Sequence, residues 1–239
     1  MQKHLNPTIL AMFFFLIHIQ SCNTLPEISF EPIRLPQTVQ TTSYYPGDDG
    51  ALQRGVKWPN PRFINHGNGA ITDRLTGLMW EAMPRKQHVD WYQAFDRINE
   101  LNREKLGGFS DWRMPNINEL VSILNWSGNN PIEYLEKFGF NLHSIRRKEI
   151  IPGIRRYCYD VTYFWSSSTY GSGGNDYKAH AINLFSNIYK IGQDKKSKKR
   201  LIKNCYAVFF VIAVRGQSTG IAKIPKTGQT KSYHLGDDG

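Results

Sequence analysis

The sequence has few of the residues that build catalytic and metal centres. It holds three cysteines and seven histidines in 239 residues. No histidine stands with cysteines or carboxylates at a spacing typical of metal ligands. The triplet Ser166-Ser167-Ser168 lacks the flanking glycines of a nucleophile elbow. We therefore expect a protein that is not an enzyme and that needs no cofactor and no metal.

Long apolar runs are also missing. The run from Ile9 to Ile17 would extend only ~14 Å as a helix, against a hydrocarbon core of ~30 Å. With Lys3 before it, this run predicts a signal peptide over residues 1–21. The following Ile19-Gln20-Ser21-Cys22 resembles the bacterial lipobox. The resemblance implies that Cys22 is acylated and anchors the chain to a membrane of the bacterial cell envelope, at the outer membrane or cell surface. An ordinary secreted protein is the alternative.

Acidic residues are outnumbered by basic ones. The chain has 30 Lys and Arg against 20 Asp and Glu. Removal of the signal peptide takes away only Lys3, which leaves 29 against 20. Such an excess favours polyanionic partners such as acidic glycans or lipid headgroups. Nucleic acid would satisfy the same charge, but an envelope location argues against it, so we expect no nucleic-acid partner.

Lipidation of Cys22 would leave two cysteines, Cys158 and Cys205. An even number in an oxidising compartment favours a disulfide between them. Each cysteine stands just before an apolar segment typical of a strand, so neighbouring strands could bring the two together. Two buried free thiols are the alternative.

One block of the sequence occurs twice, 189 residues apart. Residues 35–50, the leader repeat, read LPQTVQTTSYYPGDDG, and residues 224–239, the tail repeat, read IPKTGQTKSYHLGDDG. Ten of the sixteen positions match, including the GDDG ending. The spacing suits one module plus its leader rather than a solenoid. We therefore expect residues 217–239 to be the start of a second, truncated repeat. Since such a segment buries little apolar area, we expect it to be disordered and dispensable.

The chain between the repeats divides into a tether and a domain. Residues 22–61 are rich in proline and threonine and predict an extended tether. The domain is expected over residues 62–216. Asp90 can cap a helix, Asn116 with Glu119 forms a capping box for a second helix, and a short third helix can begin at Pro131. Strand-like segments follow, at residues 162–168, 178–185, 187–192 and 205–216. This order predicts an α+β fold.

Four segments, in this order, resemble the Lcl C-terminal domain family of bacterial proteins. They are RFINHGNGAITDRLTGLMW (62–80), LGGFSDWRMPNINEL (106–120), YFWSSSTY (163–170) and VIAVRG (211–216). The resemblance implies a C-type-lectin-like fold with two helices and small antiparallel sheets, and tandem copies on surface proteins. Some relatives bind sulfated glycans or act as adhesins. Many relatives have a cysteine pair where this chain has Ile98 and Ala213, which makes the Cys158–Cys205 bridge more plausible.

The calcium site of sugar-binding C-type lectins is incomplete in this chain. Met114 stands before Pro115-Asn116, where the lectins have a carboxylate or amide ligand, and a hard cation needs several oxygens. Trp80, Trp112, Trp126 and Trp165 are most simply core aromatics, with exposed platforms for sugar rings as the alternative.

Basic clusters are the strongest functional signal in the sequence. Spaced lysines and arginines suit the sulfate and carboxylate groups of glycans. The predicted contacts are Lys195, Lys196, Lys198, Lys199 and Arg200. A solvated hairpin tip that protects a sheet edge is the plainer alternative. The sequence therefore predicts a non-catalytic surface module for anionic glycan or extracellular matrix. A structural envelope lipoprotein that contacts other proteins is the second hypothesis.

Overall fold

The computed structural model describes residues 34–127, 131–142, 148–149, 158–159, 161–170, 177–185, 188–202 and 205–238. In several strands only the backbone is described. The expected signal peptide and Cys22 lie outside these ranges. Within them, no helix has both the length and the apolar character needed to span a bilayer.

The helices of the domain begin where the sequence places capping residues. Helix α3 (Trp91–Glu104) starts at Asp90, whose side chain accepts from the Gln93 N–H in a complete capping box. Helix α4 (Ile117–Ser122) starts in the same way at Asn116. Helix α5 (Pro131–Glu136) follows. All three predicted helix starts are confirmed, and at α3 and α4 a capping box accounts for the position of the start.

Glycines end α3 as the sequence predicts. Lys105 takes a left-handed conformation at the C-terminal cap. A short 3-10 helix, η1 (Leu106–Gly108), then turns the chain, and Gly107 and Gly108 have φ of 63° and 90°. Side chains with a Cβ rarely adopt these angles, so the glycine pair is what permits the tight turn.

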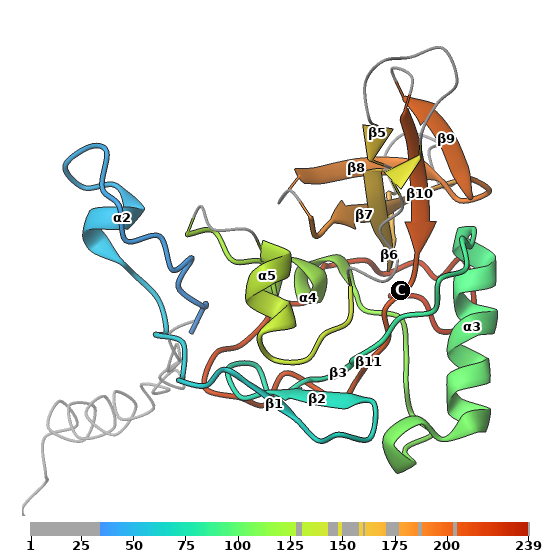
Figure 1. The fold of residues 1–239 in the computed structure, drawn as a ribbon, viewed down its shortest axis with the longest axis horizontal. Helices are drawn as coiled ribbons and strands as arrows, with labels where there is room; N and C mark the ends of the chain where they lie inside the picture. Colours follow the sequence, from blue (N-terminus) through green and yellow to red (C-terminus); the bar gives the residue numbers. More distant parts are fainter. Residues whose placement is uncertain are drawn as a thin grey trace, which may run out of the picture. The chain divides into compact units, whose positions relative to one another are not determined.

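The strands form two main sheets (Figure 1). The first has the order β1 (Phe63–Asn65), β2 (Ala70–Asp73), β3 (Met79–Glu81) and β11 (Val214–Arg215). The second has the order β8 (Ile188–Asp194), β7 (Lys178–Asn183), β6 (Val161–Thr169), β10 (Cys205–Phe210) and β9 (Lys199–Ile202). A third pair joins β4 (Lys148–Glu149) to β5 (Cys158–Tyr159).

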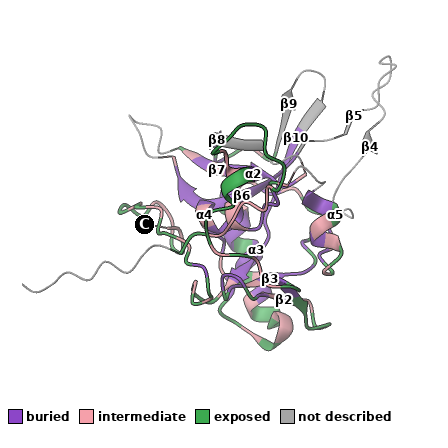
Figure 2. Cartoon of the chain, turned by 90° about the vertical axis from the view of Figure 1, so that its left-hand side faces the viewer, coloured by how far each residue is buried: buried purple, intermediate pink, exposed green. Residues whose placement is uncertain are grey.

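The second sheet is buried on both faces, because successive side chains of a strand point to opposite sides. On β6, Tyr163 and Trp165 pack into one core with α3, whereas Phe164 packs into the other with α4 and α5. On β10, Phe209 joins the first of these cores and Phe210 the second. Figure 2 shows the buried residues in purple along β6 and β7. The sheet therefore separates α3 from α4 and α5.

The α+β class is confirmed, and two details differ from the expectation. The described residues contain four α-helices rather than two: α3, α4, α5 and the short α2 (Asp49–Leu52) in the leader. The second sheet is not wholly antiparallel, because β10 runs parallel to β6, with Ala207 opposite Val161. A parallel pair needs a long connection between its strands, here the chain from residue 170 to 204. Sequence patterns within each strand do not report such a pairing.

Buried ion pairs replace some apolar contacts of the core. Arg62 and Asp73 pair at 2.7 Å with neither side chain exposed. Glu81 accepts from Arg97 and from the Ala213 N–H. Burial raises the pKa of Glu81 to about 7, against the opposing effect of Arg97. Ile98 and Ala213 are both buried in the core that α3 shares with the second sheet.

Candidate functional site: the basic turn and the docked tail

Part of the predicted basic cluster forms an exposed turn between β8 and β9. This basic turn comprises residues 195–198. Lys196 and Lys198 are exposed there. Lys199 and Arg200 lie in β9, where the backbone is described and the side chains are not. The ammonium of Lys198 is 3.8 Å from the carboxylate of Asp90, a half-exposed pair that adds little stability.

Backbone hydrogen bonds hold the basic turn against three other elements. The Trp91 N–H at the start of α3 donates to the Lys195 carbonyl at 2.8 Å. The Lys195 N–H donates to Tyr177 at 2.9 Å, and the Phe209 N–H on β10 donates to Lys198 at 3.3 Å. The turn therefore presents its exposed lysines from a fixed backbone.

Lys195 differs from the sequence prediction, because it is buried and only 2% of its surface is exposed. Its ammonium lies 4.1 Å from the centroid of the Trp91 ring and 4.6 Å from that of Tyr233. Cation–π contacts of this kind stabilise a desolvated lysine. Lys195 thus links α3 to the tail repeat instead of facing a ligand. In a run of lysines, the sequence does not indicate which one turns inward.

The tail repeat packs on the domain, contrary to the disorder expected from the sequence. His234 contacts the Trp91 ring at 5.9 Å between centroids, and further contacts come from β6, α3 and the basic turn. The Thr169 N–H donates to Gln229 at 2.7 Å, and the Ser168 hydroxyl donates to Asp238 at 2.9 Å. His234 stacks on Phe95 at 4.3 Å between centroids, and Tyr233 contacts Lys195. We call the domain surface that receives these contacts the dock: Trp91, Phe95, Ser168, Thr169 and Lys195. Figure 1 places the C-terminus beside α3 and β6.

The physical reason for this difference is that the dock supplies the partners that the tail lacks by itself. Aromatic side chains and hydrogen-bonding groups of α3, β6 and the basic turn offset the entropy cost of ordering the tail. These partners lie roughly 30 to 140 residues away in sequence, so composition alone does not predict the contact.

The docked tail adds a third exposed lysine to the basic turn. The ammonium of Lys231 lies 4.8 Å from the centroid of Tyr233, the ring that also contacts Lys195. Lys231 itself is exposed. The basic turn therefore presents Lys196 and Lys198 as exposed cations, and the tail repeat presents Lys231. Tyr233 joins the two segments, because its ring contacts both Lys231 and the buried Lys195 of the turn. We call these three exposed lysines the basic face. Sequence reasoning missed Lys231, which belongs to a segment expected to be disordered.

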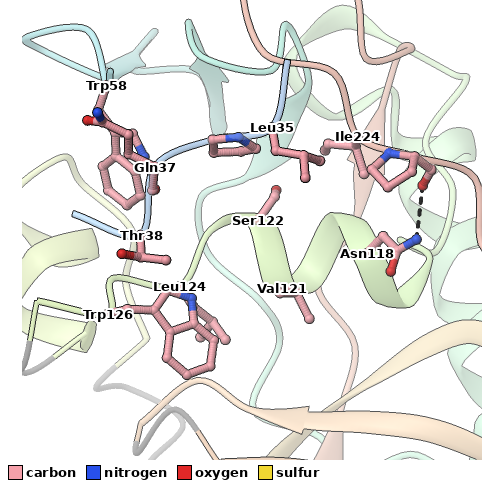
Figure 3. A pocket seen from close by; sticks show the side chains of 12 residues that line it. Leu35, Gln37, Thr38, Trp58, Asn118, Val121, Ser122, Leu124, Trp126 and Ile224 are labelled. Carbon is pink, nitrogen blue, oxygen red and sulfur yellow. Dashed lines mark hydrogen bonds between the residues drawn. The ribbon is translucent and has the colours of Figure 1, made fainter. Parts of the chain in front are cut away.

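A separate apolar groove lies between the two repeats and α4 (Figure 3). Its cavity measures about 270 Å³. Trp126 is 40% exposed and Leu35 is 48% exposed, whereas the sequence predicted Trp126 as a core residue. At the end of the groove, the Asn118 amide donates to the Pro225 carbonyl at 2.9 Å. The lining is Leu35, Pro36, Gln37, Thr38, Trp58, Asn118, Val121, Ser122, Leu124, Trp126, Ile224 and Pro225.

The residues considered for catalysis or calcium binding have structural contacts. The Ser166 hydroxyl donates to the His180 carbonyl, and Ser168 contacts the tail repeat. Asn116 caps α4. Burial lowers the pKa of His180. Among the described residues, no group of three or more His, Cys, Asp or Glu is placed to hold a metal ion.

The two cysteines of the predicted disulfide lie on neighbouring strands. Cys158 is in β5, directly before β6, and Cys205 begins β10. Because β10 pairs parallel with β6, both cysteines lie at the same end of that strand pair. Their side chains are outside the described residues, so the bridge stays a prediction.

Comparison with known proteins gives one match. The family model of the Lcl C-terminal domain matches residues 69–204, more than half of the chain. The matched region includes the basic turn, α3, strands β2 and β3 of the first sheet, and every strand of the second sheet except β10. No curated protein matches the chain, and no solved structure matches it.

Proposed function

Because this chain belongs to the Lcl C-terminal domain family, we propose that it is a non-catalytic binding module for an anionic glycan or matrix component. The observation that carries the proposal is the basic face, where Lys196 and Lys198 are exposed on the basic turn and Lys231 is exposed on the tail repeat that Tyr233 joins to this turn. The family resemblance supports the same assignment, since it implies a C-type-lectin-like fold and some relatives bind sulfated glycans.

The basic face suits a sulfated or carboxylated polymer for electrostatic reasons. Lysine ammoniums are flexible point charges that bind oxyanions through charge-assisted hydrogen bonds. The backbone of the basic turn is fixed by bonds to α3 and β10, so binding need order only the lysine side chains. Each exposed contact is weak, and several contacts along one polymer add up.

The location proposed for this module is the bacterial cell envelope, as a lipoprotein. The lipobox-like sequence before Cys22 supports acylation of that cysteine, which would hold the module at the outer membrane or cell surface. Replacing Cys22 by Ser should abolish labelling with radioactive palmitate and release the protein from the membrane fraction. Labelling that persists in this variant would contradict the lipoprotein assignment.

The glycan proposal is tested with the triple variant Lys196→Ala, Lys198→Ala and Lys231→Ala. Loss of three exposed cation contacts, each worth ~0.5–1 kcal/mol, should weaken heparin binding by roughly 10- to 100-fold. The readouts are the elution salt on a heparin column and the affinity by titration. The variant should also show a shallower dependence of affinity on salt.

A matched control removes the same charge elsewhere. Lys57, Lys105 and Lys137 are also exposed, and none of them belongs to β8, β9 or the tail repeat. Their triple alanine variant should elute close to the wild-type protein. If both triple variants lose heparin equally, binding follows net charge alone and the basic face is not the site.

A second candidate function is contact with other proteins of the envelope. The apolar groove favours it, because Leu35 and Trp126 leave apolar surface exposed beside the leader repeat. Trp126→Ser should then reduce assembly in sizing experiments without changing the elution salt on heparin.

A further inference from the structure

The leader repeat and the tail repeat have the same internal structure. In each, a threonine hydroxyl donates to the second aspartate of GDDG, and a serine hydroxyl donates to a carbonyl two residues on. In each, the first aspartate accepts the N–H of the conserved tyrosine, at 2.6 Å for Asp48 and Tyr44 and 2.7 Å for Asp237 and Tyr233. The side chains that make these bonds belong to residues among the ten that match.

The backbones of the two repeats agree as well. Gly47 and Gly236 have φ of 86° and 88°. Gly228 has φ of 81°, and its counterpart Val39 has φ of 59°, although a β-branched residue rarely adopts the left-handed region. The repeat therefore specifies one turn, which the leader adopts even where its sequence fits less well.

The surroundings of the two repeats are opposite. Tyr44 is 83% exposed and Tyr45 is 76% exposed. Their counterparts Tyr233 and His234 are partly buried against Lys195 and Phe95. A Cβ added at Gly236 would lie 3.7 Å from Phe95, whereas one added at Gly47 would meet nothing within 4 Å. The leader thus exposes the surface by which the tail docks.

Each docking contact of the tail has an equivalent in the leader. Gln40 and Asp49 are identical to the residues that accept from Thr169 and Ser168. Tyr44 is identical to Tyr233, which contacts Lys195. Tyr45 replaces His234 and keeps an aromatic ring to stack on Phe95. The leader therefore carries every group that the dock recognises.

We propose that the dock is a recognition site for this turn, and that the leader repeat of a second copy of the chain is its partner in trans. Open space beside the tail leaves room for exchange, because hollows of about 490 and 850 Å³ lie between the tail and the domain. The tethered tail competes at an effective concentration in the millimolar range. The leader repeat of a second copy therefore replaces the tail on the dock only when the contact between tail and dock is weakened. This inference does not rest on glycan binding, although exchange would replace Lys231 of the basic face by its leader counterpart Thr42.

The test uses the full mature chain with matched substitutions. His234→Ala with Asp237→Ala weakens the tail repeat, and Tyr45→Ala with Asp48→Ala makes the equivalent change in the leader repeat. By sedimentation over a wide concentration range, the tail variant should self-associate at a concentration at least tenfold below that of the wild-type chain. The variant with all four substitutions should return to monomer.

Two results would overturn the proposal. One is a tail variant that stays monomeric across the whole range. The other is a fourfold variant that associates as strongly as the tail variant, because exposure of the dock would then suffice without the leader. A synthetic peptide of residues 34–52 should dissociate the assembly, and the same peptide with Tyr45→Ala and Asp48→Ala should not.

A second measurement covers the case in which the tail variant fails to fold. The wild-type chain is prepared with the photoreactive residue benzoylphenylalanine in place of Tyr45, mixed with isotopically labelled wild-type chain and irradiated at high concentration. Crosslinks between chains should map to Trp91 or Phe95. Crosslinks between chains that map elsewhere, or their absence, would overturn the proposal.

Discussion

The leader repeat and the tail repeat share ten of sixteen residues and differ in what lies beside them. The leader turn exposes Tyr44 and Tyr45, whereas the tail turn packs Tyr233 and His234 on the dock. Their internal hydrogen bonds are nevertheless the same. Local sequence therefore specifies the turn, whereas partners distant in sequence decide whether the turn is buried.

Removing the tail repeat should have the largest effect on stability. Deletion of residues 224–239 removes the stack on Phe95 and the hydrogen bonds to Ser168 and Thr169. We expect a loss of ~2 kcal/mol in the free energy of unfolding, or roughly 4–8 °C in Tm for a domain of this size. Thermal unfolding followed by circular dichroism measures it. A Tm within one degree of the intact chain would show that the tail is dispensable.

Matched alanine substitutions at one position of the repeat should destabilise the tail more than the leader. His234→Ala loses an aromatic stack and should cost ~1 kcal/mol, whereas Tyr45→Ala removes an exposed ring and should cost under ~0.3 kcal/mol. Urea unfolding of the two variants gives the difference. Equal losses would mean that the leader turn has a stabilising contact of the same strength as the docked tail.

The smallest effect is expected in the leader, at the left-handed position of the repeat. Val39→Gly should stabilise the leader turn locally, because glycine adopts a φ of 59° without strain. Gly228→Val should destabilise the docked tail by ~1 kcal/mol or more. The first change is measured by amide exchange at Tyr44 and the second by Tm. Faster exchange of the Tyr44 amide in Val39→Gly than in the wild-type chain would contradict the strain inferred at Val39.

The sequence predicted the elements whose signals are local. Asp90 and Asn116 indicated where α3 and α4 begin, and Gly107-Gly108 indicated where α3 ends. The parallel pairing of β10 with β6 was not predictable in this way, because it depends on the connection between strands rather than on either strand.

The candidate site was predicted less completely than the fold. Lys196 and Lys198 are exposed as expected, but Lys195 turns inward, because Trp91 and Tyr233 provide two ring faces for its ammonium. Lys231 joined the basic face through a docking contact with partners far away in the chain. The duplicated sequence was the useful signal. The two copies form the same turn, but the leader exposes its aromatic side chains whereas the tail packs them on the dock.

Hydrogen exchange at matched amides of the two repeats tests directly whether the tail repeat is docked while the leader repeat is not. The Tyr44 and Tyr233 N–H groups make the same bond to an aspartate, so differences between them report the surroundings of each turn. If the tail is docked and the leader is not, exchange at Tyr233 should be at least tenfold slower than at Tyr44, and the Thr169 N–H should be protected together with Tyr233. Equal exchange at Tyr44 and Tyr233, with Thr169 unprotected, would contradict the docked tail.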